Sequence, residues 1–132
     1  MLEDKYLIVG LEASIVALHP DTGLEMWRNN MQLGGHSFVA LAVNDHSVFA
    51  SANAKRIFCI DKQRGNTKWS QPTSGMGRAT LIVSESAIFV SKGGFIDCFS
   101  LEGVLLWSKS LKKMGKKPAS LAYGLQVSQA DG

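Results

Sequence analysis

The sequence contains no apolar run that approaches the roughly 18 residues of a membrane-spanning helix, which predicts a chain without a membrane segment. It also lacks the start of a secretory signal, because Met1 is followed by Leu-Glu-Asp-Lys instead of a basic stretch and an apolar core. We therefore expect a soluble protein of the cytoplasm. A periplasmic or secreted location would require that a leader has been removed.

Cysteine is scarce, with two residues, and no metal-binding spacing is present. Neither Cys59 nor Cys98 belongs to a C-x-x-C or C-x-x-C-H motif, and the three histidines form no His-x-x-x-His pair. The sequence therefore specifies no metal or haem site, and it predicts no cofactor. The two cysteines are expected to be buried and unpaired, which suits a reducing compartment.

No segment carries apolar residues at helical spacing over three turns, and this absence predicts an all-β chain. Short segments with alternating apolar and polar residues are present instead, and they are rich in β-branched and aromatic residues. Examples are 47–52, 56–61, 87–92 and 95–100. Polar turn formers separate them, and "PDTG" (20–23) ends in a glycine, where φ can be positive.

A broad excess of charge is also missing. The formal net charge is +3, but five lysines lie within "KSLKKMGKK" (109–117), so the rest of the chain is close to neutral. A nucleic-acid partner is therefore not expected, because such proteins spread basic residues over a face. The cluster suits a solvated loop, and the alternative is an anionic partner. Its candidate binding residues are Lys112, Lys113, Lys116 and Lys117.

What the sequence does have is a repeated glycine–tryptophan motif. Tryptophan recurs at spacings of 42 and 38 residues, and each tryptophan has a glycine four positions before it and another eight positions after it. The three sets are Gly23, Trp27 and Gly35, then Gly65, Trp69 and Gly77, then Gly103, Trp107 and Gly115. About forty residues and four short strands per unit are typical of a β-propeller blade. The sequence thus predicts one domain, 1–132, of antiparallel four-stranded blades.

The predicted repeats span about 1–35, 36–77 and 78–117. Expected strands are 5–10, 14–19 and 24–29 in the first repeat, 37–43, 47–52, 56–61 and 66–70 in the second, and 78–83, 87–91, 95–100 and 104–108 in the third. The first repeat lacks an inner strand. The segment 118–128 follows Gly115 at the distance at which inner strands follow Gly35 and Gly77, so it is expected to be an inner strand.

Three blades do not close a ring, because the smallest propellers have about four. Two copies arranged head to tail would make a six-bladed homodimer, in which the C-terminal strand of each chain completes the first blade of the other. Without such a partner, the open strand edges would favour aggregation. The alternative is a fragment, or a half-propeller completed by another polypeptide.

The glycine–tryptophan motif resembles the tryptophan-docking repeat of the quinoprotein dehydrogenase-like (pyrroloquinoline quinone, PQQ-like) β-propellers. The resemblance covers about residues 2–111. In that family the glycine closes the turn between the two outer strands, and the tryptophan packs across to the neighbouring blade. The resemblance gives these roles to the pairs Gly23 and Trp27, Gly65 and Trp69, and Gly103 and Trp107. Only the first repeat keeps Asp-Thr-Gly in its turn, and the third turn is one residue shorter.

The same family includes PQQ-dependent dehydrogenases. Those enzymes resemble one another in having adjacent cysteines over the cofactor, and Glu, Asn and Asp ligands to calcium. This chain has no adjacent cysteines, and acids such as Asp45 and Glu85 are spread over turns, so no enzyme is predicted. We expect a scaffold for protein–protein interaction; the alternative is a module that binds a quinone or a sugar. His36, Arg78 and Lys116 each follow a repeat glycine, and they could attract an anion or an acidic peptide at one mouth of the ring.

Overall fold

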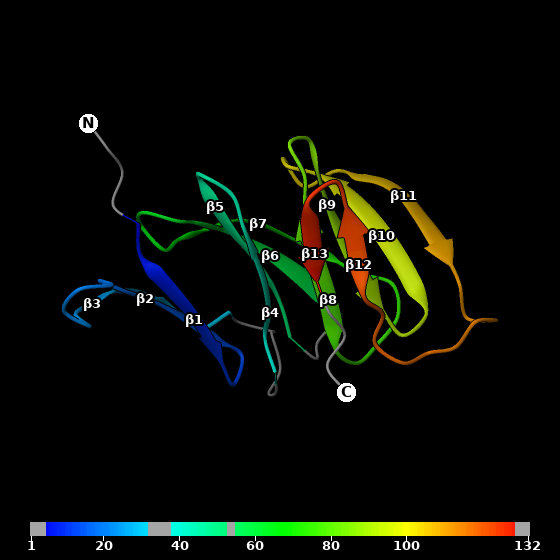
Figure 1. The fold of residues 1–132 in the computed structure, drawn as a ribbon, viewed down its shortest axis with the longest axis horizontal. Helices are drawn as coiled ribbons and strands as arrows, with labels where there is room; N and C mark the ends of the chain where they lie inside the picture. Colours follow the sequence, from blue (N-terminus) through cyan, green and yellow to red (C-terminus); the bar gives the residue numbers. More distant parts are fainter. Residues whose placement is uncertain (1–4, 32–37, 53–54, 129–132) are drawn as a thin grey trace.

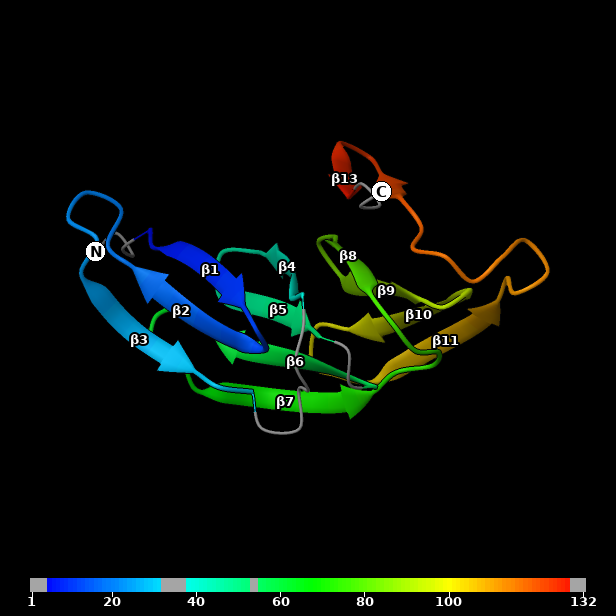
Figure 2. The same ribbon diagram turned by 90° about the horizontal axis from the view of Figure 1, so that it is seen from below.

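Strands and tight turns make up the described part of the chain, which comprises residues 5–31, 38–52 and 55–128 of a computed structural model. No helix occurs within these ranges, and the all-β prediction is confirmed. The strands form three antiparallel sheets and one short hairpin. Figures 1 and 2 show the sheets following one another round an arc, as blades do in a propeller.

Each sheet is a meander whose strands pair in chain order. The first sheet contains β1 (Leu7–Leu11), β2 (Ser14–Leu18) and β3 (Glu25–Asn29). The second contains β4 (Ala40–Val43), β5 (Ser47–Ser51), β6 (Arg56–Asp61) and β7 (Thr67–Pro72). The third contains β8 (Ala79–Val83), β9 (Ala87–Lys92), β10 (Phe95–Ser100) and β11 (Leu105–Ser110). We call these sheets blade 1, blade 2 and blade 3.

The three blades share one register. Ala17, Cys59 and Cys98 each pair with the tryptophan of the outer strand, and a β-bulge follows each of these three residues. A bulge raises the local twist and fixes the pairing, so its recurrence places every tryptophan at the same point of its blade. In Figure 2, β4 and β8 lie at the inner edge of the arc, and β3, β7 and β11 lie at the outer edge.

Two apolar cores lie between neighbouring blades. The first joins blades 1 and 2 and contains Ile15, Ala17, Trp27, Met31, Val48, Ala50, Phe58 and Ile60. The second joins blades 2 and 3 and contains Phe49, Ile57, Cys59, Leu81, Val83, Ile88, Val90 and Phe99. Alternate residues of blade 2 enter the two cores, because successive side chains of a strand point to opposite faces. Cys59 and Cys98 are free and buried, and burial raises the pKa of both thiols.

The segment after blade 3 differs from the single inner strand expected over 118–128. It forms a hairpin of β12 (Leu121–Tyr123) and β13 (Gln126–Ser128). Gly124 has φ +60°, which permits the tight turn that reverses the chain between the two strands. The hairpin lies beside β8, and the Thr80 hydroxyl donates a hydrogen bond to the Ala119 carbonyl at 2.6 Å.

Candidate functional site

The first two tryptophans span the junctions between blades. Trp27 Nε1 donates to the Lys62 carbonyl of blade 2 at 2.9 Å, and a Cβ added to Gly65 would lie 2.5 Å from the Trp27 ring. Trp69 Nε1 donates to the Leu101 carbonyl of blade 3 at 3.0 Å, and a Cβ at Gly103 would lie 2.7 Å from its ring. The contribution of these contacts to stability stays a prediction.

The third tryptophan has a different environment. Trp107 is 46% exposed and contacts Phe89, with 6.2 Å between the ring centroids. At the opposite end of the array, a Cβ added to Gly23 would meet no atom within 4 Å. Blade 3 therefore presents an uncovered tryptophan, and blade 1 presents an uncovered glycine turn.

A buried polar group that no pattern in the sequence predicted joins blades 2 and 3. Lys92 is 1% exposed, and its Nζ donates to the Ala52 carbonyl at 3.1 Å. Burial lowers the pKa of Lys92 to about 8, although the negative charge of Asp97 acts to raise it. Asp97 is also buried, and it accepts hydrogen bonds from the Ser74 amide and the Ser108 hydroxyl. Ala52 follows β5, Ser74 follows β7 and Ser108 lies within β11, so these hydrogen bonds tie blade 3 to the connections of blade 2.

The predicted basic residues that the structure describes lie at the end of blade 3 where β9 turns into β10 and where the connection after β11 begins. His36 lies outside the described residues. The Arg78 guanidinium stacks 3.7 Å above the ring centroid of Phe38, and Lys112 Nζ lies 4.9 Å from that of Phe95. The remaining cluster members Lys113, Lys116 and Lys117 are exposed on the connection after β11.

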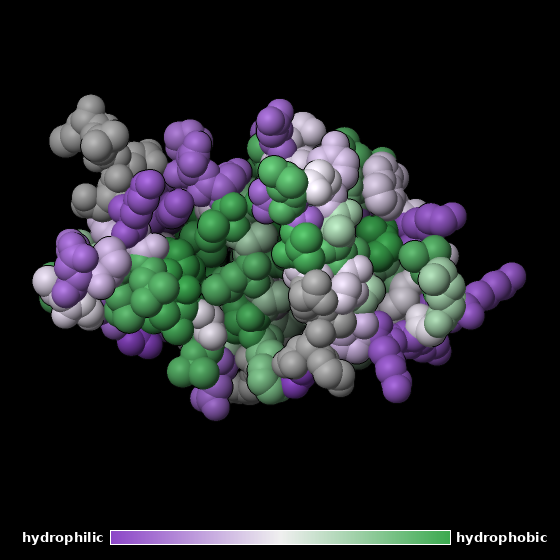
Figure 3. Space-filling view, viewed as in Figure 1, coloured by the Kyte–Doolittle hydropathy of each residue, from purple (hydrophilic) through white to green (hydrophobic). Residues whose placement is uncertain are grey.

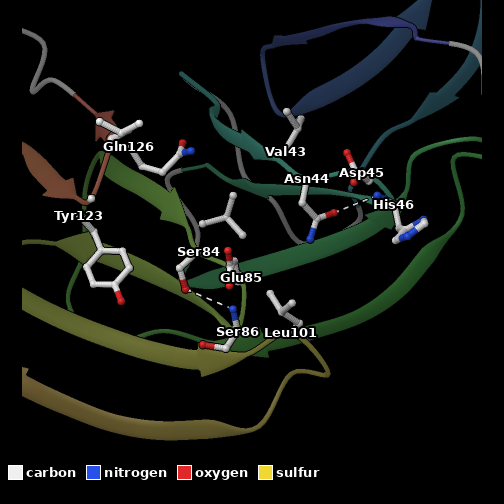
Figure 4. Close-up of a pocket in the computed structure, with 13 residues that line it drawn as sticks. Val43, Asn44, Asp45, His46, Ser84, Glu85, Ser86, Leu101, Tyr123 and Gln126 are labelled. Carbon is white, nitrogen blue, oxygen red and sulfur yellow. Dashed lines mark hydrogen bonds between the residues drawn. The ribbon is translucent and has the colours of Figure 1, made fainter.

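A hollow of about 830 Å³ lies at the other end of the blades, and we call it the turn pocket. Three turns surround it: 44–46 between β4 and β5, 84–86 between β8 and β9, and 124–125 between β12 and β13. Its lining residues are Val43, Asn44, Asp45, His46, Val83, Ser84, Glu85, Ser86, Leu101, Tyr123, Gly124, Leu125 and Gln126. Figure 4 shows where the labelled lining residues lie, on turns of successive blades and on the C-terminal hairpin.

Two of these turns are held by their own side chains. The Asn44 carboxamide oxygen accepts the amides of His46 at 3.0 Å and Ser47 at 2.8 Å (Figure 4). In the next blade, the Ser84 hydroxyl accepts the amides of Ser86 and Ala87. Because Asn44 and Ser84 satisfy the backbone, the exposed carboxylates one position later do not serve as caps and are available to a ligand.

The turn pocket combines negative charge with apolar surface. Its acids, Asp45 and Glu85, occupy equivalent turn positions and are exposed. Tyr123 is 59% exposed and Leu125 is 99% exposed. The two acids are visible in the sequence as equivalent turn residues, but the pocket is not, because its residues are separated by about forty positions. The signal that could have found it is the repeat period itself, which places 44–46 and 84–86 side by side.

Metal-ligating groups were sought throughout the part of the chain that the structure describes. Within residues 5–31, 38–52 and 55–128, no group of three or more His, Cys, Asp or Glu side chains could hold a metal ion. The same ranges contain no helix long and apolar enough to span a membrane. The arrangement of carboxylates, an imidazole and apolar side chains on rigid turns is suited to binding.

Comparison with known proteins places this architecture in a family. The family model described as outer membrane protein assembly factor BamB matches residues 11–130. The crystal structure of BamB from Moraxella catarrhalis is similar, with a TM-score of 0.66 and 22% identity over 80% of this chain and 33% of that chain. No curated protein matches the chain.

Two enzyme structures share the fold at lower identity. Quinohemoprotein alcohol dehydrogenase ADHIIG from Pseudomonas putida HK5 has a TM-score of 0.66 and 17% identity, over 83% of this chain and 20% of that chain. A europium-containing methanol dehydrogenase has a TM-score of 0.60 and 15% identity, over 80% of this chain and 22% of that chain. The present chain therefore spans a third or less of each of these structures.

Proposed function

The chain belongs to the BamB family of PQQ-like propeller-repeat proteins, and on this premise we propose that it is a non-catalytic scaffold that holds a protein partner at the turn pocket. The observation that carries the proposal is the convergence of three turns on one hollow of about 830 Å³. Rigid blades that present variable turns are a common way to position a binding surface. The name of the matched family, an assembly factor, is consistent with a role in protein association.

The chemistry of the turn pocket favours one kind of partner. Asp45 and Glu85 would attract a cationic group, while Val43, Tyr123 and Leu125 would pack against an apolar side chain. A peptide segment with leucine or phenylalanine flanked by lysine or arginine matches both features. An acidic segment would be repelled here and would suit the lysine cluster at the opposite end.

The proposal is tested with labelled peptides of the two charge types and the pure protein. Fluorescence anisotropy should show binding of the basic–apolar peptide, and Asp45→Asn with Glu85→Gln should weaken it about tenfold. Glu102→Gln is the control, since Glu102 is exposed in a turn and does not line the pocket. Preference for the acidic peptide, lost when Lys112, Lys113, Lys116 and Lys117 are neutralised, would move the function to the lysine cluster.

A small ligand is the second candidate, because a hollow of this volume falls within the range of small-molecule sites. The described residues do not fit the quinoprotein arrangement: Cys59 and Cys98 are buried on different blades, and no set of metal-ligating side chains is present among them. Thermal-shift measurements with PQQ and with sugars separate the two candidates. A raised melting temperature with either compound would favour the ligand-binding function.

Homodimerisation belongs to the same proposal. A six-bladed ring of two head-to-tail copies would hold two turn pockets at one mouth, so that both could contact one partner. The alternative is completion of the array by another polypeptide. Either partner would have to cover the exposed Trp107 of blade 3 and the open Gly23 turn of blade 1.

A further inference from the structure

The two tryptophans inside the array donate to residues that build the turn pocket. Trp27 Nε1 donates to the carbonyl of Lys62, and Trp69 Nε1 donates to the carbonyl of Leu101. Lys62 comes directly after β6, and Leu101 comes directly after β10, so the two acceptors hold equivalent places in blades 2 and 3. Both junctions are complete within this chain. Each of them therefore ends at the same end of the blades as the turn pocket.

In blade 2, Lys62 connects the docked Trp27 to the first turn of the pocket. The Lys62 amide donates to the His46 carbonyl at 3.0 Å, and its Nζ donates to the Asn44 carbonyl at 3.1 Å. These two carbonyls flank Asp45, which is one of the two acids of the pocket. The indole N–H of Trp27 holds the Lys62 carbonyl at 2.9 Å. Trp27 therefore fixes the residue to which the acidic turn is bonded.

In blade 3, the equivalent residue reaches the pocket with its own side chain. Leu101 is partly buried and lines the pocket (Figure 4). Its turn is closed by the Gly103 amide, which donates to the Ser100 carbonyl, and by the Val104 amide, which donates to the Ser100 hydroxyl. Trp69 lies against this turn, because a Cβ at Gly103 would lie 2.7 Å from its ring. Trp69 therefore fixes the turn that places Leu101.

The turn pocket has an acidic part and an apolar part. In Figure 3, apolar side chains gather over β1 and β4, and hydrophilic side chains gather at the upper edge, beside the turn between β4 and β5. Val43 at the end of β4 and Asp45 in that turn both line the pocket, so the pocket lies where the two kinds of surface meet. Lys62 supports the acidic turn, and Leu101 adds to the apolar surface.

From these contacts we infer that each docked tryptophan is a positioning residue for one part of the turn pocket. Trp27 positions the acidic turn 44–46, which takes the cationic residues of a peptide. Trp69 positions Leu101, which takes part in holding the apolar side chain. A carbonyl that loses its donor inside a junction is costly, so its turn would shift, and a site that is held less rigidly binds less tightly. The inference rests on the proposed function, because it assigns roles within the same pocket.

Three labelled peptides test the two roles by fluorescence anisotropy. The first has a leucine flanked by lysines, the second has alanine in place of the leucine, and the third has glutamine in place of the lysines. Trp69→Phe keeps an aromatic ring but removes the indole N–H. It should lower the preference for leucine over alanine about fivefold and leave the preference for lysine over glutamine unchanged. Trp27→Phe should have the reverse effect.

Each variant is the control for the other, because both remove the same group from inside a junction. A purely structural role would weaken the binding of all three peptides by one factor, and that result in both variants would overturn the inference. Circular dichroism verifies folding. If a phenylalanine variant does not fold, Gly65→Ala and Gly103→Ala supply a second pair, since the added methyl groups would displace the Trp27 and Trp69 rings.

A double-mutant cycle tests whether Trp69 acts through Leu101. Leu101→Ala keeps the carbonyl that accepts Trp69 Nε1, and it should lower the preference for leucine over alanine by itself. Trp69→Phe added to Leu101→Ala should lower this preference no further, because the side chain that Trp69 positions is then absent. A second, additive loss would contradict the positioning role of Trp69.

Amide hydrogen exchange followed by NMR tests the positioning without any peptide. Four hydrogen-bonded amides report on the two turns: Lys62 and Ser47 for the acidic turn, and Gly103 and Val104 for the turn of Leu101. Trp27→Phe should speed the exchange of the first pair about tenfold and leave the second pair unchanged, and Trp69→Phe should have the reverse effect. Equal changes at both turns in either variant would overturn the inference.

The two measurements separate the inference from the proposed function. If the intact protein binds none of the peptides, the proposed function fails, and the exchange rates alone decide whether the tryptophans position the turns. If the intact protein binds the first peptide but each variant loses both preferences equally, the proposed function stands and the positioning roles are refuted.

Discussion

The junctions inside the array and the open faces at its two ends use the same sequence positions in different surroundings. Trp27 is 9% exposed inside a junction, whereas Trp107 is 46% exposed at an end. The contrast is clearest at the last residues of β1 and β9, which hold equivalent positions in their blades. Leu11 of β1 is 70% exposed, whereas Lys92 of β9 is 1% exposed. Burial in this protein is therefore decided by whether a neighbouring blade is present, more than by the residue itself.

The largest expected effect is on the free energy of unfolding, and it compares Trp69, inside the array, with Trp107 at its end. Trp69 contacts Phe49 and Phe99 and donates to the Leu101 carbonyl, so Trp69→Ala should lower the free energy of unfolding by about 3–5 kcal/mol. Trp107→Ala should lower that free energy by about 1 kcal/mol or less, as expected for an exposed side chain. Urea titration at low protein concentration measures both. Equal losses would show that docking between blades does not stabilise the fold.

Most of the fold was predictable from the sequence, because each blade carries its signals locally. Alternation of apolar and polar residues and the spacing of glycine before tryptophan gave all eleven blade strands, with ends that differ by up to three residues. The family resemblance to PQQ-like propellers is confirmed as well, by the family model over residues 11–130.

The features that sequence reasoning missed depend on contacts between distant segments. The turn pocket gathers turns that lie about forty positions apart, and the buried Lys92 depends on Ala52 of the preceding blade. The C-terminal hairpin escaped notice because its strands have three residues each, too few for an alternation to be visible. Whether the basic residues bind a partner stays a prediction.

The second effect concerns the pH dependence that the buried Lys92 should give to the junction between blades 2 and 3. Burial lowers its pKa from 10.5 to about 8, so between these values the unfolded chain binds more protons than the folded chain. Stability contributed by this group should therefore rise with pH through this window, and the burial cost should be full below pH 8. Relative to Lys92→Met, the wild type should gain up to about 3 kcal/mol as the pH rises from 7.5 to 10.5.

Exposed Lys109 provides the control for this measurement. Lys109→Met should follow the wild-type pH profile, because its ammonium group stays in water in both states. Urea titrations at several pH values give the three profiles. A wild type and a Lys92→Met variant with parallel profiles would contradict the burial of a titrating lysine at this junction.

The smallest expected effect compares two glycines that share a backbone conformation and differ in their cover. Gly65 and Gly23 have φ +83° and +76°, so alanine at either position should cost about 1 kcal/mol through backbone strain. At Gly65 the new methyl group would also lie 2.5 Å from the Trp27 ring, and moving the indole should cost a further 1–3 kcal/mol, roughly. At Gly23 no atom lies within 4 Å of the added group.

The difference between Gly65→Ala and Gly23→Ala therefore measures the contact of Trp27 with the glycine turn, free of the strain that both variants share. Thermal unfolding of the two variants measures this difference. Repeating the pair in a Trp27→Ala background should abolish it, because the methyl group at position 65 then has room. A difference that survives the loss of the indole would assign the cost to the Gly65 turn itself, and the glycine would then be required for its backbone conformation and not for the docking of tryptophan.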